Sequence, residues 1–212
     1  MLVVNMKAYS EANGEKAVNI ARACEKAAEL TGKKVIVAPQ HTDLLRLNEI
    51  DIEIYGQHLD PVKPGSQTGH TTAEALNKAE CSGTLINHSE RRIEPKKIEK
   101  SIQRAEENGL TTIVCAQNPE ECENLSRFGP DYIAYEPPEL IGGNTSVSNA
   151  KPELIEEAVK RSERDVLTGA GIKDSKDVDK SIELGCEGVL VASGVVKSEK
   201  PEEAAKELCK GL

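Results

Sequence analysis

Eight short runs rich in Val, Ile and Leu recur along the chain, and a polar segment separates each run from the next. Near-continuous apolar runs of this length indicate strands buried on both faces, as in parallel sheets covered by helical crossovers. We therefore expect eight parallel strands along the chain. The runs are "LVVNMK" (2–7), "KVIVAP" (34–39), "IEIYGQ" (52–57), "GTLINH" (83–88), "TTIVCA" (111–116), "YIAYEP" (132–137), "DVLTGA" (165–170) and "GVLVAS" (188–193).

The segments between these runs are rich in Lys and Glu and carry apolar residues at helical spacing. Four prolines stand where a first helical turn would begin, a position that tolerates the missing N–H. They are Pro95, Pro119, Pro152 and Pro201. We expect helices over residues 14–30, 94–108, 151–163, 175–185 and 200–209.

No linker rich in Gly, Pro or Ser interrupts this alternation of strands and helices. Eight successive strand-then-helix units predict an α/β fold, a closed (β/α)8 barrel that occupies residues 1–212 as a single domain. An open doubly wound sheet is the alternative. It is less favoured because the stretch "NMKAYSEANGE" after the first expected strand lacks the G-x-G-x-x-G turn of that fold.

Composition limits the partners that the chain can have. With 38% hydrophobic residues among 212, the chain can bury a core. Its 27 basic and 36 acidic residues give a net charge of −9, which disfavours non-specific binding to nucleic acids and anionic membranes. We expect neither as a partner, and an anionic ligand would need local positive charge. The N-terminal residues resemble no secretory signal, and no apolar span is long enough for a membrane helix.

The cysteines and histidines show no sign of a metal site or a disulfide framework. The four histidines include no pair at i, i+4 spacing, so we expect no metal. The six cysteines are scattered, without a C-x-x-C pair, in a chain too large to need disulfides for stability. We expect them to be reduced, mostly buried thiols in a cytoplasmic protein. They are Cys24, Cys81, Cys115, Cys122, Cys186 and Cys209.

In a (β/α)8 barrel, active sites are built at the carboxyl ends of the strands, so the residues there are the candidates for function. Lys7 supplies a cation, His88 an imidazole and Glu136 a carboxylate. Small residues after the seventh and eighth strands would let backbone N–H groups approach a phosphate. The full set of strand-end candidates is Asn5, Lys7, Gln57, Asn87, His88, Glu136, Gly169 to Gly171 and Ala192 to Gly194.

Five motifs at these strand ends together resemble the triosephosphate isomerase family, in its shorter archaeal form. The resemblance runs over the whole chain in the family's order. The motifs are "NMK" (5–7), "NHSERR" (87–92), "AYEPPELIGG" (134–143), "TGAGI" (168–172) and "VLVASG" (189–194).

The resemblance implies a catalyst that interconverts dihydroxyacetone phosphate and D-glyceraldehyde 3-phosphate in glycolysis and gluconeogenesis. It implies that Glu136 is the base that moves a proton between neighbouring carbons. His88 would then polarise the carbonyl, and Lys7 would face the developing enediolate, with Glu90 in support. A carboxylate alone is too weak a base for such a proton, and the histidine and lysine would stabilise the charge that develops. No cofactor is implied.

The resemblance also implies the groups that bind the substrate and exclude water. Residues 137–143 would form a lid, with prolines at its first hinge and glycines at its end. A helix beginning at "SERR" would keep His88 neutral. The substrate-binding residues implied are Asn5, Met6, Lys7, Ile141, Gly142, Gly171, Ala192 and Ser193, although the side chain of Met6 is expected to pack.

The sequence departs from the common form of the family at three strand ends. Asn87 replaces the usual Gly before the histidine. Loop seven has Thr168, Gly169, Ala170 and Gly171 instead of Tyr-Gly-Gly-Ser, so the hydroxyls that would latch a closed lid are missing. Loop eight has Ala192 and Ser193 in place of two glycines.

The polar stretch at 57–76 resembles an arm that docks into a neighbouring subunit near Asn5 and Lys7, with Thr68 and Gly69 at its tip. Because short archaeal members form tetramers, we expect a homotetramer. Two other functions fit a barrel of this kind. One is a phosphoribosyl isomerase, and the other is a barrel without catalytic activity that only binds a sugar phosphate or a protein.

Overall fold

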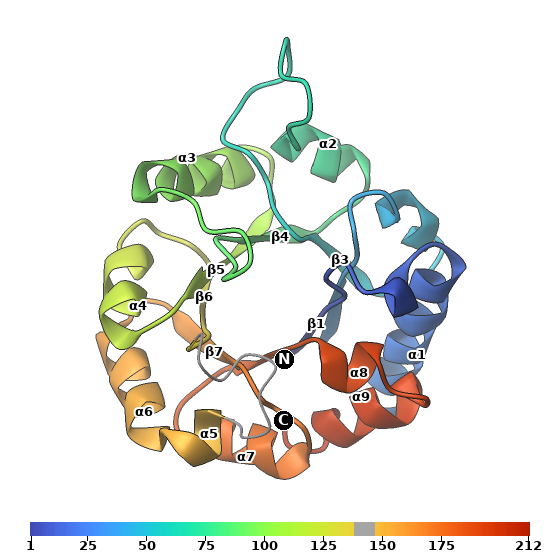
Figure 1. Cartoon of the computed structure of the whole chain (residues 1–212), viewed down its shortest axis with the longest axis vertical. Coiled ribbons are helices and arrows are strands. Elements are labelled where there is room, and N and C mark those ends of the chain that lie inside the picture. The colour runs from blue at the N-terminus through green and yellow to red at the C-terminus, as the bar shows by residue number, and fades with distance from the viewer. Residues whose placement is uncertain (138–146) are drawn as a thin grey trace.

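The computed structural model describes residues 1–137 and 147–212, except for the side chains of residues 147 and 149. Eight strands close into a barrel, each one parallel to the next in chain order, with helices around the outside (Figure 1). The strands are β1 (Leu2–Asn5), β2 (Val35–Ala38), β3 (Glu53–Gly56), β4 (Gly83–Ile86), β5 (Thr111–Ala116), β6 (Tyr132–Tyr135), β7 (Asp165–Gly169) and β8 (Gly188–Val191).

Pairing between the first and last strands closes the barrel. Leu2 of β1 lies opposite Val35 of β2 on one side and Val189 of β8 on the other. The predicted (β/α)8 barrel is therefore confirmed, and the open doubly wound sheet is excluded, because such a sheet leaves its edge strands unpaired. The observed strands end one or two residues earlier than most of the apolar runs, which puts Lys7, His88 and Glu136 just beyond them.

All five predicted helices are present, within about two residues at their ends. They are α1 (Glu15–Thr31), α3 (Pro95–Glu106), α6 (Pro152–Arg161), α7 (Ser175–Glu183) and α9 (Pro201–Cys209). Shorter helices that we did not predict are α2 (Ala73–Lys78), α4 (Pro119–Ser126), α5 (Val147–Ala150) and α8 (Ser193–Val196), with 3-10 turns at Ser10–Ala12 and Leu44–Leu47. All four prolines named above lie in the first turn of a helix.

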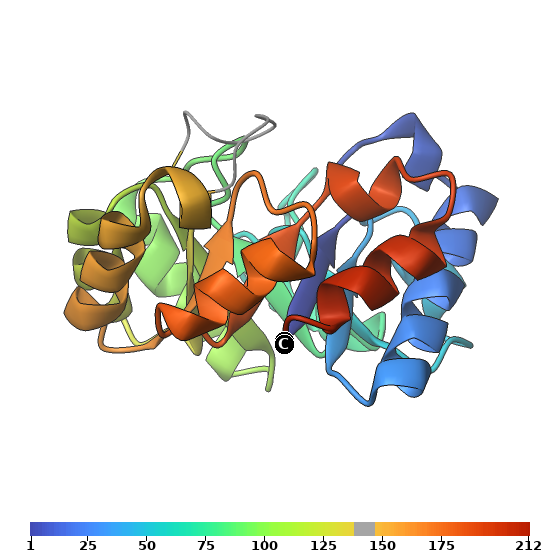
Figure 2. The ribbon, with the colours of Figure 1, turned by 90° about the horizontal axis from the view of Figure 1, so that it is seen from below.

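The barrel interior is filled by side chains and is not a channel. Side chains alternate between the two faces of a strand, so alternate residues of each strand point to the barrel axis while the residues between them pack against helices. The inward layer is Val3, Ile36, Tyr55, Leu85, Ile113, Ala134, Leu167 and Leu190, each at most 3% exposed. Figure 2 shows the helices around this core from the side.

All six cysteines are buried and free, as predicted. Burial raises the pKa of the thiols of Cys24, Cys81 and Cys122 to about 12, and that of Cys186 to about 11. These thiols therefore stay protonated at neutral pH. Among the described residues, none of the helices has the length and apolar character needed to cross a membrane.

Candidate active site

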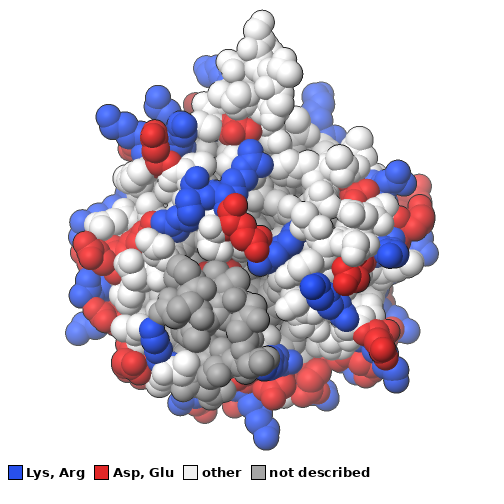
Figure 3. Space-filling view, viewed as in Figure 1, with Lys and Arg blue, Asp and Glu red and all other residues white. Residues whose placement is uncertain are grey.

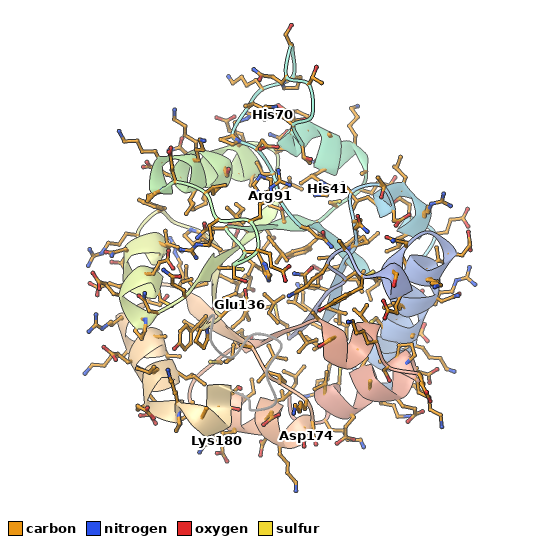
Figure 4. The ribbon with its side chains drawn as sticks, in the orientation of Figure 1. His41, His70, Arg91, Glu136, Asp174 and Lys180 are labelled. Atoms are coloured by element: carbon orange, nitrogen blue, oxygen red, sulfur yellow. The ribbon has the colours of Figure 1, made fainter. Side chains whose placement is uncertain are left out.

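A pocket of about 280 Å³ opens at the carboxyl end of the barrel, among the loops that follow β1, β4, β6, β7 and β8. Figure 4 shows Glu136 close to the barrel axis at this end. The pocket brings together seven of the residues predicted for catalysis or binding: Asn5, Lys7, His88, Glu136, Gly171, Ala192 and Ser193.

Lys7 has a strained backbone that its neighbours hold in place. Its φ of 47° lies in the left-handed region, which costs a residue with a side chain about 1–2 kcal/mol. The Lys7 N–H donates to Asn5 Oδ1 at 3.0 Å, and Gln57 Nε2 donates to the Lys7 carbonyl at 2.9 Å. These bonds offset the strain, so Asn5 and Gln57 act on the site by fixing the direction of Lys7.

The Lys7 ammonium group points into the mouth of the pocket and is paired there. Its Nζ lies 2.8 Å from Glu90 Oε1, and its side chain is 12% exposed while that of Glu90 is 59% exposed. Because the acidic partner is largely solvated, it can leave the ammonium group at small cost. Lys7 is thus a positively charged group that is fixed in position and can still contact an anionic ligand. It supplies local positive charge in a protein whose net charge is −9.

His88 is oriented by the turn that follows β4. The backbone N–H of Glu90 donates to His88 Nδ1 at 3.2 Å, so Nδ1 is an acceptor and the ring proton belongs on Nε2. The expected helix start at "SERR" is wrong, because Ser89 and Glu90 form a turn and α3 begins only at Pro95. A single backbone amide, and not a helix N-terminus, therefore orients the ring.

Asn87 explains how this chain does without the usual glycine before the histidine. Its φ is 62°, a conformation that Asn tolerates better than most residues. Its side chain donates to the Cys115 carbonyl at 3.0 Å and accepts from the Ile93 N–H at 3.0 Å. Asn87 therefore adopts a left-handed backbone and makes two hydrogen bonds that fix the His88 turn, one of them to β5.

Glu136 is a buried carboxylate that faces the imidazole of His88. Its residue exposure is 6%, equal to that of His88, and its Oε2 lies 3.5 Å from His88 Nε2. Among the described residues, this oxygen has no hydrogen-bond partner. Its backbone N–H donates to the Ala116 carbonyl at 2.8 Å, so the main chain that carries this side chain is fixed.

Cys115 lies next to Glu136 inside the barrel. Burial, together with the nearby Glu136 carboxylate and a hydrogen bond to it, raises the pKa of the Cys115 thiol well above its ordinary value. The thiol therefore remains a neutral donor beside the carboxylate.

The loops after β7 and β8 form the opposite wall of the pocket. Ala170 and Gly171 have φ values of 76° and 74°, and consecutive amides in such conformations can form a concave site for an anion. Lys173 also lines the pocket. This wall therefore combines small residues, which a ligand can approach closely, with a lysine.

Three predicted binding residues are not part of this pocket as described. Met6 is fully buried in the core and does not line the pocket. Ile141 and Gly142 lie outside the described residues, as does most of the expected lid. The pocket also contains the strand-end candidates Ala170 and Gly194, and residues that we did not predict, namely Tyr9, Ile172, Lys173, Leu190 and Val191. Lys173 directly follows the "TGAGI" motif, and this position beside a strand-end motif is the sequence signal that could have identified it as a pocket residue.

A second groove, of about 310 Å³, lies beside Lys7 toward the arm. Figure 4 shows His41 and Arg91 on this side of the mouth, with His70 farther out on the arm. Burial lowers the pKa of His41 and of His58, and the Arg91 charge lowers both further. His58 Nε2 lies 3.2 Å from Asp60 Oδ1. Both rings are therefore neutral at pH 7.

Charged side chains surround the mouth of the pocket. Figure 3 shows Lys and Arg beside Asp and Glu in the middle of this face. Arg92 is paired with Glu121, and Arg91 lies 4.0 Å from Asp60, so both arginines have acidic neighbours. Among the described residues, no group of three His, Cys, Asp or Glu side chains is arranged to hold a metal ion.

Comparison with known proteins gives one family. A family model described as triosephosphate isomerase matches residues 1–210. The triosephosphate isomerase of Methanocaldococcus jannaschii is 47% identical over 216 residues, which cover 99% of this chain and 99% of that protein. That of Caldivirga maquilingensis is 45% identical, covering 100% and 97%, and that of Methanothermus fervidus is 44% identical, covering 98% and 96%.

The fold has a counterpart among solved structures. The crystal structure of triosephosphate isomerase from Bartonella henselae superposes with a TM-score of 0.71 at 20% sequence identity, and the match covers 92% of both chains. At this identity the likeness concerns the fold alone.

We expect His88 to be a neutral imidazole at pH 7 with its proton on Nε2. A proton on Nδ1 would replace the bond from the Glu90 N–H with two donors facing each other. Nitrogen-15 NMR of histidine-labelled protein reads the tautomer, and the His88→Gln variant assigns the signal. A doubly protonated ring at pH 7, or a proton on Nδ1, would contradict this.

Proposed function

The chain belongs to the triosephosphate isomerase family, and we propose that Glu136, His88 and Lys7 perform its interconversion of dihydroxyacetone phosphate and D-glyceraldehyde 3-phosphate. One observation carries the proposal. Glu136 Oε2 has no hydrogen-bond partner in the part of the chain that the structure describes, and it lies 3.5 Å from His88 Nε2, with Lys7 lining the same pocket.

Proton transfer begins at Glu136. Its carboxylate takes a proton from C1 of dihydroxyacetone phosphate, the electron pair of that C–H bond forms a C=C bond, and the carbonyl π electrons move onto the C2 oxygen. The carboxylic acid then returns a proton to C2, and the electron pair on the C1 oxygen re-forms a carbonyl. The base is thereby regenerated as a carboxylate.

His88 and Lys7 make this transfer possible because the α-proton is far less acidic than a carboxylic acid. The Nε2–H of His88 donates to the oxygen that gains charge, protonates O2 and recovers a proton from O1. The Lys7 ammonium group stabilises the enediolate electrostatically. A neutral histidine beside a glutamate base is the established pairing for this reaction, and loss of one preorganised donor costs about 10²- to 10³-fold in rate.

The phosphate group binds at the opposite wall, where Gly171, Ala192 and Ser193 line the pocket. Lys173 adds a positive charge there. We also assign Ile141 and Gly142 to the phosphate contact, as parts of a lid over residues 137–143. A lid is needed because an enediolate phosphate in water eliminates its phosphate.

The arm at 57–76 supports assembly into a homo-oligomer, which we propose is a tetramer. Two hydrogen bonds between Asp60 and Thr71 close the base of the arm. The Asp60 N–H donates to the Thr71 carbonyl at 2.8 Å, and the Thr71 N–H donates to Asp60 Oδ2 at 2.8 Å. Beyond this base, residues 63–70 are all exposed. A Cβ added at Gly65 or Gly69 would meet no atom within 4 Å.

The groove beside Lys7 suits the tip of a partner's arm. The tip at 64–69 has no charged residue and protrudes from the body of the molecule (Figure 3). The groove is lined by Lys7, His41, Gln57 and Arg91, among others, so an inserted arm would cover the residues that hold Lys7. We place the protein in the cytoplasm because its six free thiols suit a reducing compartment.

Glu136→Asp should reduce turnover by about 10²-fold or more, because a displacement on the order of 1 Å of a reacting group has that effect. A coupled assay with glyceraldehyde 3-phosphate and a dehydrogenase measures the rate. Affinity for a phosphate-bearing enediolate mimic should fall much less, since Lys7 and the phosphate wall are unchanged. Near-normal turnover of the variant would refute the role of Glu136 as the base.

Deleting residues 66–69 should produce smaller particles with reduced activity. The tip could no longer dock into the partner's groove, and Lys7 beside that groove would then be misplaced. Sedimentation velocity and the coupled assay check the two effects on the same sample. Ser66→Ala, a change at the same tip that keeps the length of the arm, is the control. A deletion variant that stays tetrameric and active would refute the docking role.

A further inference from the structure

Gly169, the last residue of β7, lies directly beside the side chain of Glu136. Tyr135 pairs with Thr168, so the next positions along the two strands, Glu136 and Gly169, are neighbours at the mouth. A Cβ built on Gly169 would lie 2.5 Å from Cγ, 2.8 Å from Oε1 and 3.0 Å from Cδ of Glu136. Carbon atoms in contact are normally about 3.5–4.0 Å apart.

Backbone conformation does not account for this glycine. Gly169 is paired with Leu190 as part of a regular parallel ladder, and its φ is not among the positive values found in this chain. An alanine could adopt the same backbone. The position is therefore restricted by space, and the space is filled by the Glu136 side chain.

Neither residue can move away freely. The backbone of β7 is bonded to β6 on one side and to β8 on the other. The Glu136 backbone is held by its bond to the Ala116 carbonyl, and its side chain is buried against His88. An added methyl group would therefore displace mainly the carboxylate, by about 1 Å, to restore a normal contact distance.

We propose that Gly169 is a positioning residue, whose missing side chain provides the space in which the Glu136 carboxylate faces His88. This inference rests on the proposed role of Glu136 as the base. It gives Gly169 a function separate from the phosphate wall formed by its neighbours Ala170 and Gly171. Gly169→Ala should displace the carboxylate from its alignment with the substrate carbon.

Other glycines in the strands have different surroundings. An added Cβ at Gly83 or Gly188 would first meet backbone, of Thr111 or Met1 respectively. At Gly56, the last residue of β3, it would meet the Leu76 methyl groups at 2.9 and 3.0 Å. Gly56 is thus a matched control, because a Cβ added there would crowd the flexible Leu76 side chain of α2, outside the barrel, and no reacting group.

The first test compares steady-state kinetics of Gly169→Ala and Gly56→Ala. We expect kcat of Gly169→Ala to fall about 10²-fold, as for a comparable displacement of the base, while KM changes little because the phosphate wall is intact. Gly56→Ala should keep a kcat close to that of the parent. Normal kcat in Gly169→Ala would overturn the inference, as would an equal loss in Gly56→Ala.

The second test measures the contact without using activity. Gly169→Ala is introduced into the parent and into Glu136→Ala, which has no Cγ to be crowded, and thermal melting is followed for all four proteins. We expect Gly169→Ala to lower the Tm of the parent more than that of Glu136→Ala, since contacting residues are coupled. Equal shifts would overturn the inference, as would failure of Gly169→Ala to fold in both backgrounds.

The two proposals fail in different ways. If Glu136→Asp keeps its turnover, the role of Glu136 as the base is wrong, and with it the positioning role of Gly169, even where the melting temperatures show coupling. If Glu136→Asp loses turnover but Gly169→Ala does not, the base assignment stands and only the role of Gly169 is wrong. Coupled melting together with a kcat loss in Gly169→Ala supports both.

Discussion

The pairing of β1 with both β2 and β8 is the constraint on which the site depends. Closure brings the carboxyl ends of all eight strands to one mouth, so residues as distant in sequence as Lys7 and Glu136 share a pocket. A parallel sheet left open would separate its first and last strands. The inward layer of apolar side chains fills the barrel below the mouth, and the polar groups therefore rest on a close-packed floor.

Strained backbone at this mouth is held by specific hydrogen bonds. Lys7 and Asn87 both have positive φ values. Side-chain bonds from Asn5 and Gln57 fix Lys7, and the side chain of Asn87 itself bonds to Cys115 of β5. Such strain persists only where the surroundings support it. The result is a cation and an imidazole with fixed directions, facing a buried carboxylate.

The sequence was sufficient to predict the barrel, and that Lys7, His88 and Glu136 would meet at its mouth, because short apolar runs and strand-end motifs are local signals. It did not predict how those residues are held. The turn after His88 was expected to be a helix, since "SERR" resembles a helix start, whereas a single amide of Glu90 performs the orienting role. The restriction at Gly169 depends on a neighbour from another strand, which only the register reveals. Short helices such as α2 and α4 have too few turns for periodicity to identify them.

Isomerisation of dihydroxyacetone phosphate in D2O tests the central claim most directly, namely that a carboxylate moves a proton through an enediolate. A proton held by a carboxylic acid exchanges with solvent, so the account predicts solvent deuterium at C2 of at least part of the glyceraldehyde 3-phosphate formed. NMR of the product, trapped by rapid oxidation, shows the label. Product that retains the hydrogen of the substrate completely would indicate direct hydride transfer and would contradict the account.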